Sequence, residues 1–247
     1  MKKRIALFLV FIVTSQILGC GANAAHPPAY FDNSYGKIPD SVFVVGGFDF
    51  PKVASSPTLT EISGDIGIRL THSIDLIARP SIKTYEYKND EGDYWSQSCK
   101  ANGVMLGANL LVLEKKFNEE DHQLLLQPMF GFERSYIADI YSTSISLMGK
   151  TIANKYLTLG GSVTPYVSMP TNAKPILNDT LPGLNLFSDN DVVEPLHMSY
   201  GVDFSGFIGL RVKNLFELSL SLMAGICKTS TYNCSNSGFA VSTMFGH

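Results

Sequence analysis

The stretch from Glu194 to Cys227 constrains the fold most, because two consecutive segments there alternate apolar and polar side chains at period two. The first segment carries on one face Leu196, Met198, Tyr200, Val202, Phe204, Ile208, Leu210 and Val212. After a short turn at Lys213-Asn214 the alternation resumes, with Phe216, Leu218, Leu220, Leu222, Ala224 and Ile226 on one face. The pattern predicts a hairpin of two long antiparallel strands.

The length of these two segments indicates the class of sheet. Strands of globular proteins usually have about five or six residues, whereas a tilted strand that crosses a bilayer needs about nine to eleven. Both segments belong to the longer class. We therefore expect an all-β protein, a closed antiparallel up-and-down transmembrane β-barrel.

Residues 1–24 have the organisation of a secretory signal peptide. Three basic residues precede the apolar run Ile5 to Val13, which is too short for a permanent membrane span. The small residues of Ala22-Asn23-Ala24 favour cleavage before Ala25. The alternative is a lipoprotein-type site at Ile17-Leu18-Gly19-Cys20, in which case Cys20 becomes the lipidated first residue.

The rest of the chain reads as an irregular lead-in over residues 25–40 and one β-barrel domain over residues 41–247. The formal net charge of −3 offers no basic surface for nucleic acid. After the leader, no run of eighteen or more apolar residues suggests a helical membrane span.

The strand series before the hairpin is expected at Ser41–Phe50, Thr60–His72, Ile74–Tyr87, Asn102–Leu113, Gln123–Tyr136, within Ile137–Ala153 and at Tyr156–Met169, and a last strand at Gly238–Phe245 follows it. This gives about ten strands, or eight if two weaker ones fail. Turns are expected near Ser73, Glu114–His122, Asn154-Lys155 and Lys213-Asn214, and loops at Pro51–Pro57, Lys88–Ala101, Pro170–Val193 and Lys228–Ser237. Short connections that alternate with longer ones are typical of outer-membrane barrels, with periplasmic turns and outer loops.

Composition indicates which face is the interior. A water-facing sheet normally carries many charges, yet only 17% of residues are charged, and the second face of Asn102–Leu113 holds Gly103, Met105, Gly107, Asn109, Leu111 and Leu113. We expect the apolar faces to point outward to lipid. The sparse charges would then pair inside a side-chain-filled lumen without porin-like conductance: Asp65 with Arg69, Asp75 with Arg79, and Asp203 with Arg211 beside Glu217. A soluble lipocalin-like ligand-binding barrel in the periplasm is the alternative.

The leader, the long alternating strands, the unequal loops and the aromatic-rich last strand resemble the small bacterial outer-membrane β-barrel proteins. The resemblance implies a Gram-negative outer membrane, with membrane lipid, lipopolysaccharide and the barrel assembly machinery as partners. The chain departs from these barrels at its end, where Gly246-His247 follows Phe245 in place of a terminal aromatic residue.

Candidate catalytic residues are His197 and Ser199, two apart on one face, with Glu217 on the next strand. Their spacing resembles that of outer-membrane lipid A deacylases, but Tyr200 stands where those enzymes carry asparagine. A plain polar pair facing the lumen is favoured over a lipid or ester hydrolase.

Cys227 and Cys234 flank an outer loop, so a disulfide between them is favoured in an oxidising compartment. Cys99 is then unpaired or competes for one of them. The cysteine spacing does not suit zinc, and we expect no metal and no cofactor. The sequence therefore predicts a non-enzymatic outer-membrane barrel whose outer loops contact a ligand or a protein partner.

Overall fold

The structure is a computed structural model that describes residues 42–49, 52–53, 58–87, 97–117, 120–135, 138–154, 156–173, 197–212, 216–230 and 233–246. All its elements in these ranges are strands: β1 Val42–Asp49, β2 Lys52–Val53, β3 Thr58–Thr71, β4 Ile74–Tyr87, β5 Gln97–Phe117, β6 Glu120–Ser135, β7 Asp139–Ile152, β8 Leu157–Thr171, β9 Ser199–Val212, β10 Phe216–Thr229 and β11 Asn233–Gly246. Within the described ranges there is no helix of the length and hydropathy needed to span a bilayer.

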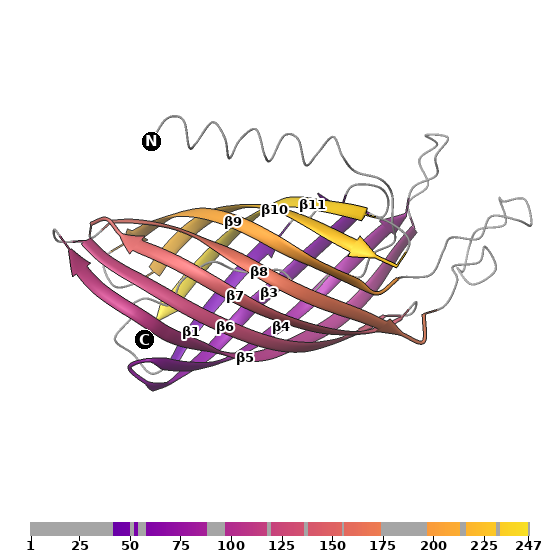
Figure 1. Cartoon of the computed structure of the whole chain (residues 1–247), viewed down its shortest axis with the longest axis horizontal. Coiled ribbons are helices and arrows are strands. Elements are labelled where there is room, and N and C mark those ends of the chain that lie inside the picture. Colours follow the sequence, from indigo (N-terminus) through magenta and orange to yellow (C-terminus); the bar gives the residue numbers. More distant parts are fainter. Residues whose placement is uncertain are drawn as a thin grey trace, which may run out of the picture.

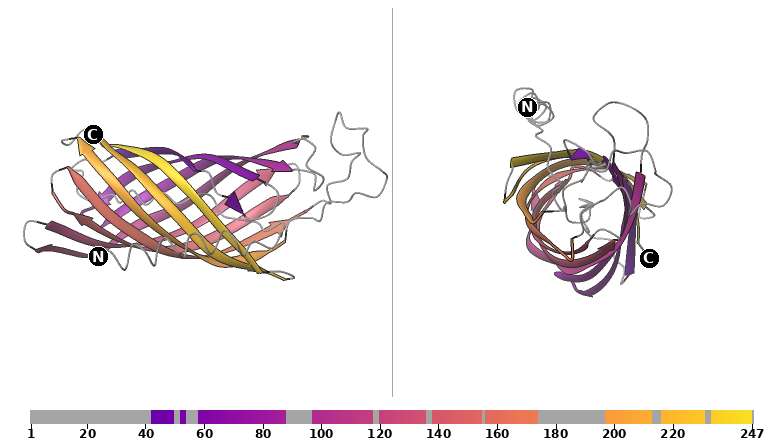
Figure 2. Two further views of the ribbon diagram at one scale, coloured as in Figure 1. Left: turned by 90° about the horizontal axis from the view of Figure 1, so that it is seen from above. Right: turned by 90° about the vertical axis from the view of Figure 1, so that its right-hand side faces the viewer.

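The strands form one antiparallel sheet in which each long strand pairs with the next along the chain. β1 pairs with β3 on one side and with β11 on the other. The two-residue β2 adds to the edge of β11 through Val53 and Asn236. Figure 2 shows the strands curving around a common axis. The prediction of an all-β, antiparallel, up-and-down sheet is confirmed.

The connections divide the molecule into two ends (Figure 1). At one, the short-connection end, β3 leads to β4, β5 to β6, β7 to β8 and β9 to β10, with four or fewer residues between strands. At the opposite, long-connection end, residues 88–96 join β4 to β5 and residues 172–198 join β8 to β9. β1 starts and β11 ends at the short-connection end, since Phe43 lies opposite Gly246.

The alternation of side chains located most strands well. β4 has the predicted bounds, Ile74–Tyr87, even though Pro80 lies within it. Pro80 is exposed, and a proline there costs one ladder hydrogen bond without changing the direction of the strand. The short pattern within Ile137–Ala153 forms the full strand β7.

Several predicted connections were too long. β5 already begins at Gln97 and continues to Phe117, so the predicted loop Lys88–Ala101 and turn Glu114–His122 both shrink. The predicted loop Lys228–Ser237 shrinks because β10 runs to Thr229 and β11 begins at Asn233. Within Pro51–Pro57 the short β2 forms. In each case polar residues suggested a loop, yet polar side chains at strand ends leave the backbone ladder intact.

Apolar side chains predominate on the face that points away from the axis, and the buried polar side chains point toward it. The burial of β7 alternates residue by residue, with Ile145 half exposed and its neighbours Ser144 and Ser146 buried. The outward set includes Ile66, Ile68, Leu76, Leu106, Phe130, Leu147, Leu159, Ile208, Leu210, Leu218, Leu220 and Ile226. This is the reverse of the arrangement in a water-soluble barrel, in which the apolar face is buried.

One strand changes its alternation midway. In β5, Met105 and Asn109 face the interior as the sequence pattern indicated. The register against β6 shifts between Leu111 and Leu113, and Val112 and Leu113 are then both exposed. Leu113 therefore lies on the outside, against the prediction, because a β-bulge adds one residue and turns the following side chains over.

Candidate functional site: the interior polar network

Charged and polar side chains from nearly every described strand meet in the interior. Those that are buried include Ser63, Asp65, Asp75, Arg79, Ser81, Asn109, Gln123, Gln127, Glu133, Ser142, Ser144, Ser146, Lys150, Thr158, Ser162, Thr164, Ser168, Ser199, Asp203, Glu217, Ser219, Ser221 and Thr229. Burial of so many polar groups is costly unless they are hydrogen-bonded or paired. Their hydrogen-bond and ion-pair partners therefore show which contacts stabilise the interior.

The carboxylate of Glu217 is the centre of one cluster. Its Oε2 lies 3.2 Å from Nε of Arg211 and 3.6 Å from Nζ of Lys150, and it accepts a hydrogen bond of 3.3 Å from Oγ1 of Thr158. Lys150 belongs to β7 and Glu217 to β10, and these strands are not neighbours. The Lys150 side chain therefore crosses the interior past β8 and β9.

Glycine makes room for this crossing. A Cβ on Gly209 of β9 would lie 2.6 Å from Oε1 of Glu217 and 3.1 Å from its Cδ. A larger residue at position 209 would push the carboxylate away from its two cations. The position of the Glu217 carboxylate therefore depends on the absence of a side chain at Gly209.

A second cluster lies on the wall made by β3 to β6. Arg79 donates from Nε to Oδ1 of Asp65 at 2.5 Å and from Nη2 to Oδ2 at 2.7 Å, a forked pair with both side chains fully buried. Nη2 of Arg79 also lies 3.5 Å from Oε1 of Gln127, whose Nε2 donates to Oδ1 of Asn109 at 2.9 Å. This network connects Asp65 on β3 with residues of β4, β5 and β6. The most distant of them in the sequence, Gln127, is 62 positions from Asp65.

The predicted charge partners are exchanged in the structure. Arg79 pairs with Asp65, and Arg69 pairs with Asp75 at 2.8 Å. Asp65 and Arg69 are four residues apart on one strand, hence about 13 Å apart, whereas the antiparallel register brings Arg69 opposite Asp75. For the same reason Arg211 pairs with Glu217 across the hairpin and not with Asp203 on its own strand.

Glu217 lies far from the other proposed catalytic residues. Ser199 lies opposite Thr229, whereas Glu217 lies opposite Arg211 at the other end of the same hairpin. Glu217 and Thr229 are twelve positions apart in the sequence, which corresponds to about 40 Å along the strand. Glu217 therefore cannot orient His197, and the Ser-His-Glu interpretation is wrong in that respect.

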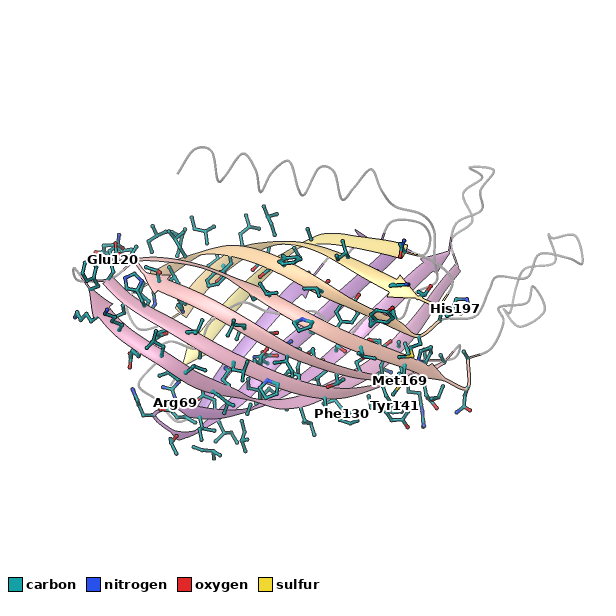
Figure 3. The ribbon with its side chains drawn as sticks, in the orientation of Figure 1. Arg69, Glu120, Phe130, Tyr141, Met169 and His197 are labelled. Carbon is teal, nitrogen blue, oxygen red and sulfur yellow. The ribbon has the colours of Figure 1, made fainter. Side chains whose placement is uncertain are left out.

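Ser199 instead belongs to a row of hydroxyl groups at the long-connection end. In the register Ser142 lies opposite Ser168, Ser168 opposite Ser199, and Ser199 opposite Thr229. All four are buried, and the Ser142 and Ser168 hydroxyl oxygens are 2.9 Å apart. His197 lies at the same end of the molecule, two residues before Ser199 in the chain (Figure 3).

Three interior residues were missed by sequence reasoning: Lys150, Gln127 and Glu133. Each is buried and faces inward. The signal was present, since Lys150 falls on the same period-two face of β7 as Ser142, Ser144 and Ser146. The alternation of Tyr141, Thr143, Ile145 and Leu147 that indicated this strand ends before Lys150.

The other predicted sites lie partly outside the described residues. Cys227 on β10 lies opposite Cys234 on β11 in the backbone register, and Cys99 lies within β5 opposite Tyr85. Cys20, the leader and the lead-in fall outside the described residues, as does most of the loop Pro170–Val193. In the described part of the chain no group of three or more His, Cys, Asp or Glu side chains could hold a metal ion.

Comparison with known proteins gives general likenesses of fold. No protein family model matches the chain, and no curated protein matches its sequence. Among solved structures, the chain is similar to the KdgM porin in complex with disordered oligogalacturonate, with 10% identity, a TM-score of 0.36, and coverage of 83% of this chain and 99% of the porin. It is also similar to the COG4313 outer membrane channel from Pseudomonas putida F1, with 8% identity, a TM-score of 0.41, and coverage of 92% and 99%.

A third similar structure is Ail, the attachment invasion locus protein of Yersinia pestis, with 9% identity, a TM-score of 0.27, and coverage of 83% of this chain and 97% of Ail. An antiparallel up-and-down sheet with an apolar exterior and an ion-paired interior is the architecture of an outer-membrane β-barrel protein.

Proposed function

We propose that this chain is a closed, ten-stranded barrel of the bacterial outer membrane, with an interior filled by side chains, that acts through its outer loops and not as an enzyme. The short-connection end would face the periplasm and the long-connection end the cell exterior. The pairing of β1 with β11 supports closure. The unequal connections support the orientation.

The inverted polarity of the sheet carries the proposal. Leu210 is 56% exposed and Ile66 50%, whereas Arg79 is 0% and Glu217 1% exposed. In water, the apolar surface of these exposed aliphatic side chains would cost about 25 cal/mol for each Å² and would promote aggregation. In a bilayer the same outward face is favourable, and the polar groups are removed from lipid.

The height of the outward apolar band fits a membrane. On β9 the band begins at Tyr200 and ends at the level of Arg211, whose side chain faces the interior and whose backbone N–H donates to the carbonyl oxygen of Tyr156. Tyr200 and Tyr156 are both about half exposed and mark the two ends. Eleven residues span about 37 Å along the strand, or about 26–30 Å along the axis at a tilt of 35–45°. The hydrocarbon core of a bilayer is about 30 Å thick.

The filled interior argues against an open pore. The largest side chains that are fully buried there are Arg79, Met105, Ile140, Met148, Gln127, Glu133 and Glu217. Together with the cross-interior contact of Lys150, they support an interior filled by side chains. An eight- to ten-stranded barrel is narrow even before its side chains are counted.

Binding is assigned to the loops at the long-connection end, residues 88–96 and 174–196, which lie outside the described residues. Loops carried by a rigid sheet are the usual place for recognition. The proposed partners are a protein or ligand at these loops, lipopolysaccharide and membrane lipid around the sheet, and the barrel assembly machinery during insertion. Lipidation at Cys20 remains an alternative to cleavage before Ala25.

We also propose a disulfide between Cys227 and Cys234 that staples the outer end of the β10–β11 hairpin. The disulfide-bonded state of Cys227 and the register that sets Cys234 opposite it support the pairing. An outer-membrane location would keep such a bond oxidised.

The proposal is tested by cell fractionation, a gel with unboiled and boiled samples, and planar-bilayer recording of the purified protein. We expect the protein in the outer-membrane fraction, a mobility change on boiling, and no steady ion conductance. Extraction by buffer without detergent would support the soluble periplasmic barrel instead. A stable conductance step in the wild type would overturn the filled interior and indicate a channel.

A further inference from the structure

We propose that the outward face of β6 to β10 at the long-connection end binds the phosphorylated headgroup of lipopolysaccharide, with Arg134 and Lys228 as its cationic anchors. This surface rests on the membrane orientation proposed above. It is distinct from the loops, because both of its cations belong to strands.

Arg134 is a cation fixed in place at the end of a strand. It is next to last in β6 and its side chain is 71% exposed. Its Nε donates to Oδ1 of Asp139 at 3.0 Å, and its Cζ lies 5.5 Å from the ring centre of Phe132. Asp139 thus engages Nε, and no further partner within the described chain engages the two terminal nitrogens. A guanidinium held in this way presents two parallel donors, the arrangement that suits a phosphate.

An aromatic layer lies directly below this cation along the barrel axis. Phe132 and Tyr141 are cross-strand neighbours with ring centres 5.1 Å apart. Phe130, Tyr141 and Met169 lie toward the same end as His197, opposite to Arg69 and Glu120 (Figure 3). Aromatic side chains of outer-membrane barrels sit at the level of the lipid headgroups. The layer therefore places Arg134 where lipid phosphates lie.

Lys228 provides the second anchor by the same construction. It is next to last in β10, exposed, and opposite the half-exposed Tyr200 on the outward face of β9. Four strand spacings separate β6 from β10, about 19 Å along the sheet. Between them lie half-exposed Met169 on β8 and half-exposed Met198, which directly precedes β9. The result is an apolar surface with a cation near each side.

The chemistry of this surface fits lipopolysaccharide better than a protein partner. Directly below the cations, the outward side chains of the described strands β6 to β10 are apolar or aromatic except Thr143, which suits acyl chains under a phosphorylated sugar headgroup. A protein docking on the sheet would have to displace lipid along the whole band. Phosphates are the strongest anionic groups available at the outer surface, and they are matched by a forked guanidinium and an ammonium group.

The test uses the purified full-length barrel in detergent with lipid A carrying its phosphates and with lipid A from which the phosphates have been removed. Bound lipid is counted by native mass spectrometry, and affinity is obtained by titration. We expect phosphorylated lipid A to be retained. R134Q and K228Q should each weaken it several-fold, and the double variant by about tenfold or more. K115Q is the matched control, because Lys115 is exposed at the short-connection end.

Equal retention of the two lipid A forms, or an equal loss with K115Q, would overturn the proposal and would indicate general acyl-chain or charge effects. Each variant is also run boiled and unboiled. A variant that still shows the mobility change has folded as a barrel, so loss of lipid binding can be separated from failure of the membrane-barrel proposal itself.

Discussion

Replacing Glu217 by glutamine should destabilise the protein more than removing either of its cationic partners. The side chain of Lys150 is 0% exposed and that of Glu217 1%, so the variant removes the counter-charge that Glu217 gives to a fully buried ammonium group. Breaking a buried pair on one side costs about 3–5 kcal/mol. In the single variants K150M and R211Q, Glu217 keeps one cation and the Thr158 hydroxyl. We expect these to lose only about 1–2 kcal/mol.

The free energy of unfolding is measured by urea titration of the protein folded into lipid vesicles, with the mobility change on boiling and tryptophan fluorescence as two signals. The double variant E217Q/K150M should recover at least about 1 kcal/mol relative to E217Q, since the buried ammonium group is removed. S219A, a change in a buried neighbour on β10, serves as the control. A loss below about 0.5 kcal/mol for E217Q, or a double variant less stable than E217Q, would refute the reasoning.

Three further predictions concern the same architecture. G209A should destabilise by about 1–3 kcal/mol in the same urea titration, because its Cβ would lie 2.6 Å from Oε1 of Glu217, whereas G149A, whose Cβ would meet nothing within 4 Å, should stay near wild type. I145R, on the outward face of β7, should cost about 2–4 kcal/mol in vesicles, while I145F should be tolerated; an unaffected I145R would argue against lipid contact there. Reductant should change the mobility of the unboiled wild type and not that of C227S/C234S, and identical gels with and without reductant would count against the proposed bridge.

The candidate site could be predicted from the sequence only in part. The alternation of Ser219 and Ser221 with Leu218 and Leu220 shows which side chains share a face, and this information is local to a strand. This alternation was enough to predict that Glu217 faces the interior. It could not show that Lys150, 67 positions away, would be its partner, because that contact depends on how far three intervening connections shift the strands.

The exchanged charge pairs make the same point. In the sequence, Asp65 and Arg69 are close and of opposite sign, which suggests a pair. In an extended strand, sequence neighbours on one face are separated by about 7 Å for every two residues, and the real neighbours come from the adjacent strand. The partner of Asp65 is then fixed by the turn after Thr71, whose length sets the register and brings Arg79 opposite.

The sequence by itself determined the strand class, most strand positions and the outward direction of the apolar faces, because side-chain alternation and strand length are properties of each segment alone. Only the tertiary structure decided the registers, the bulge after Leu111, the return of β1 to β11 and the contacts across the interior. These depend on the summed offsets of all strands around the barrel. A change of one residue in any turn would alter them while leaving every local pattern as it is.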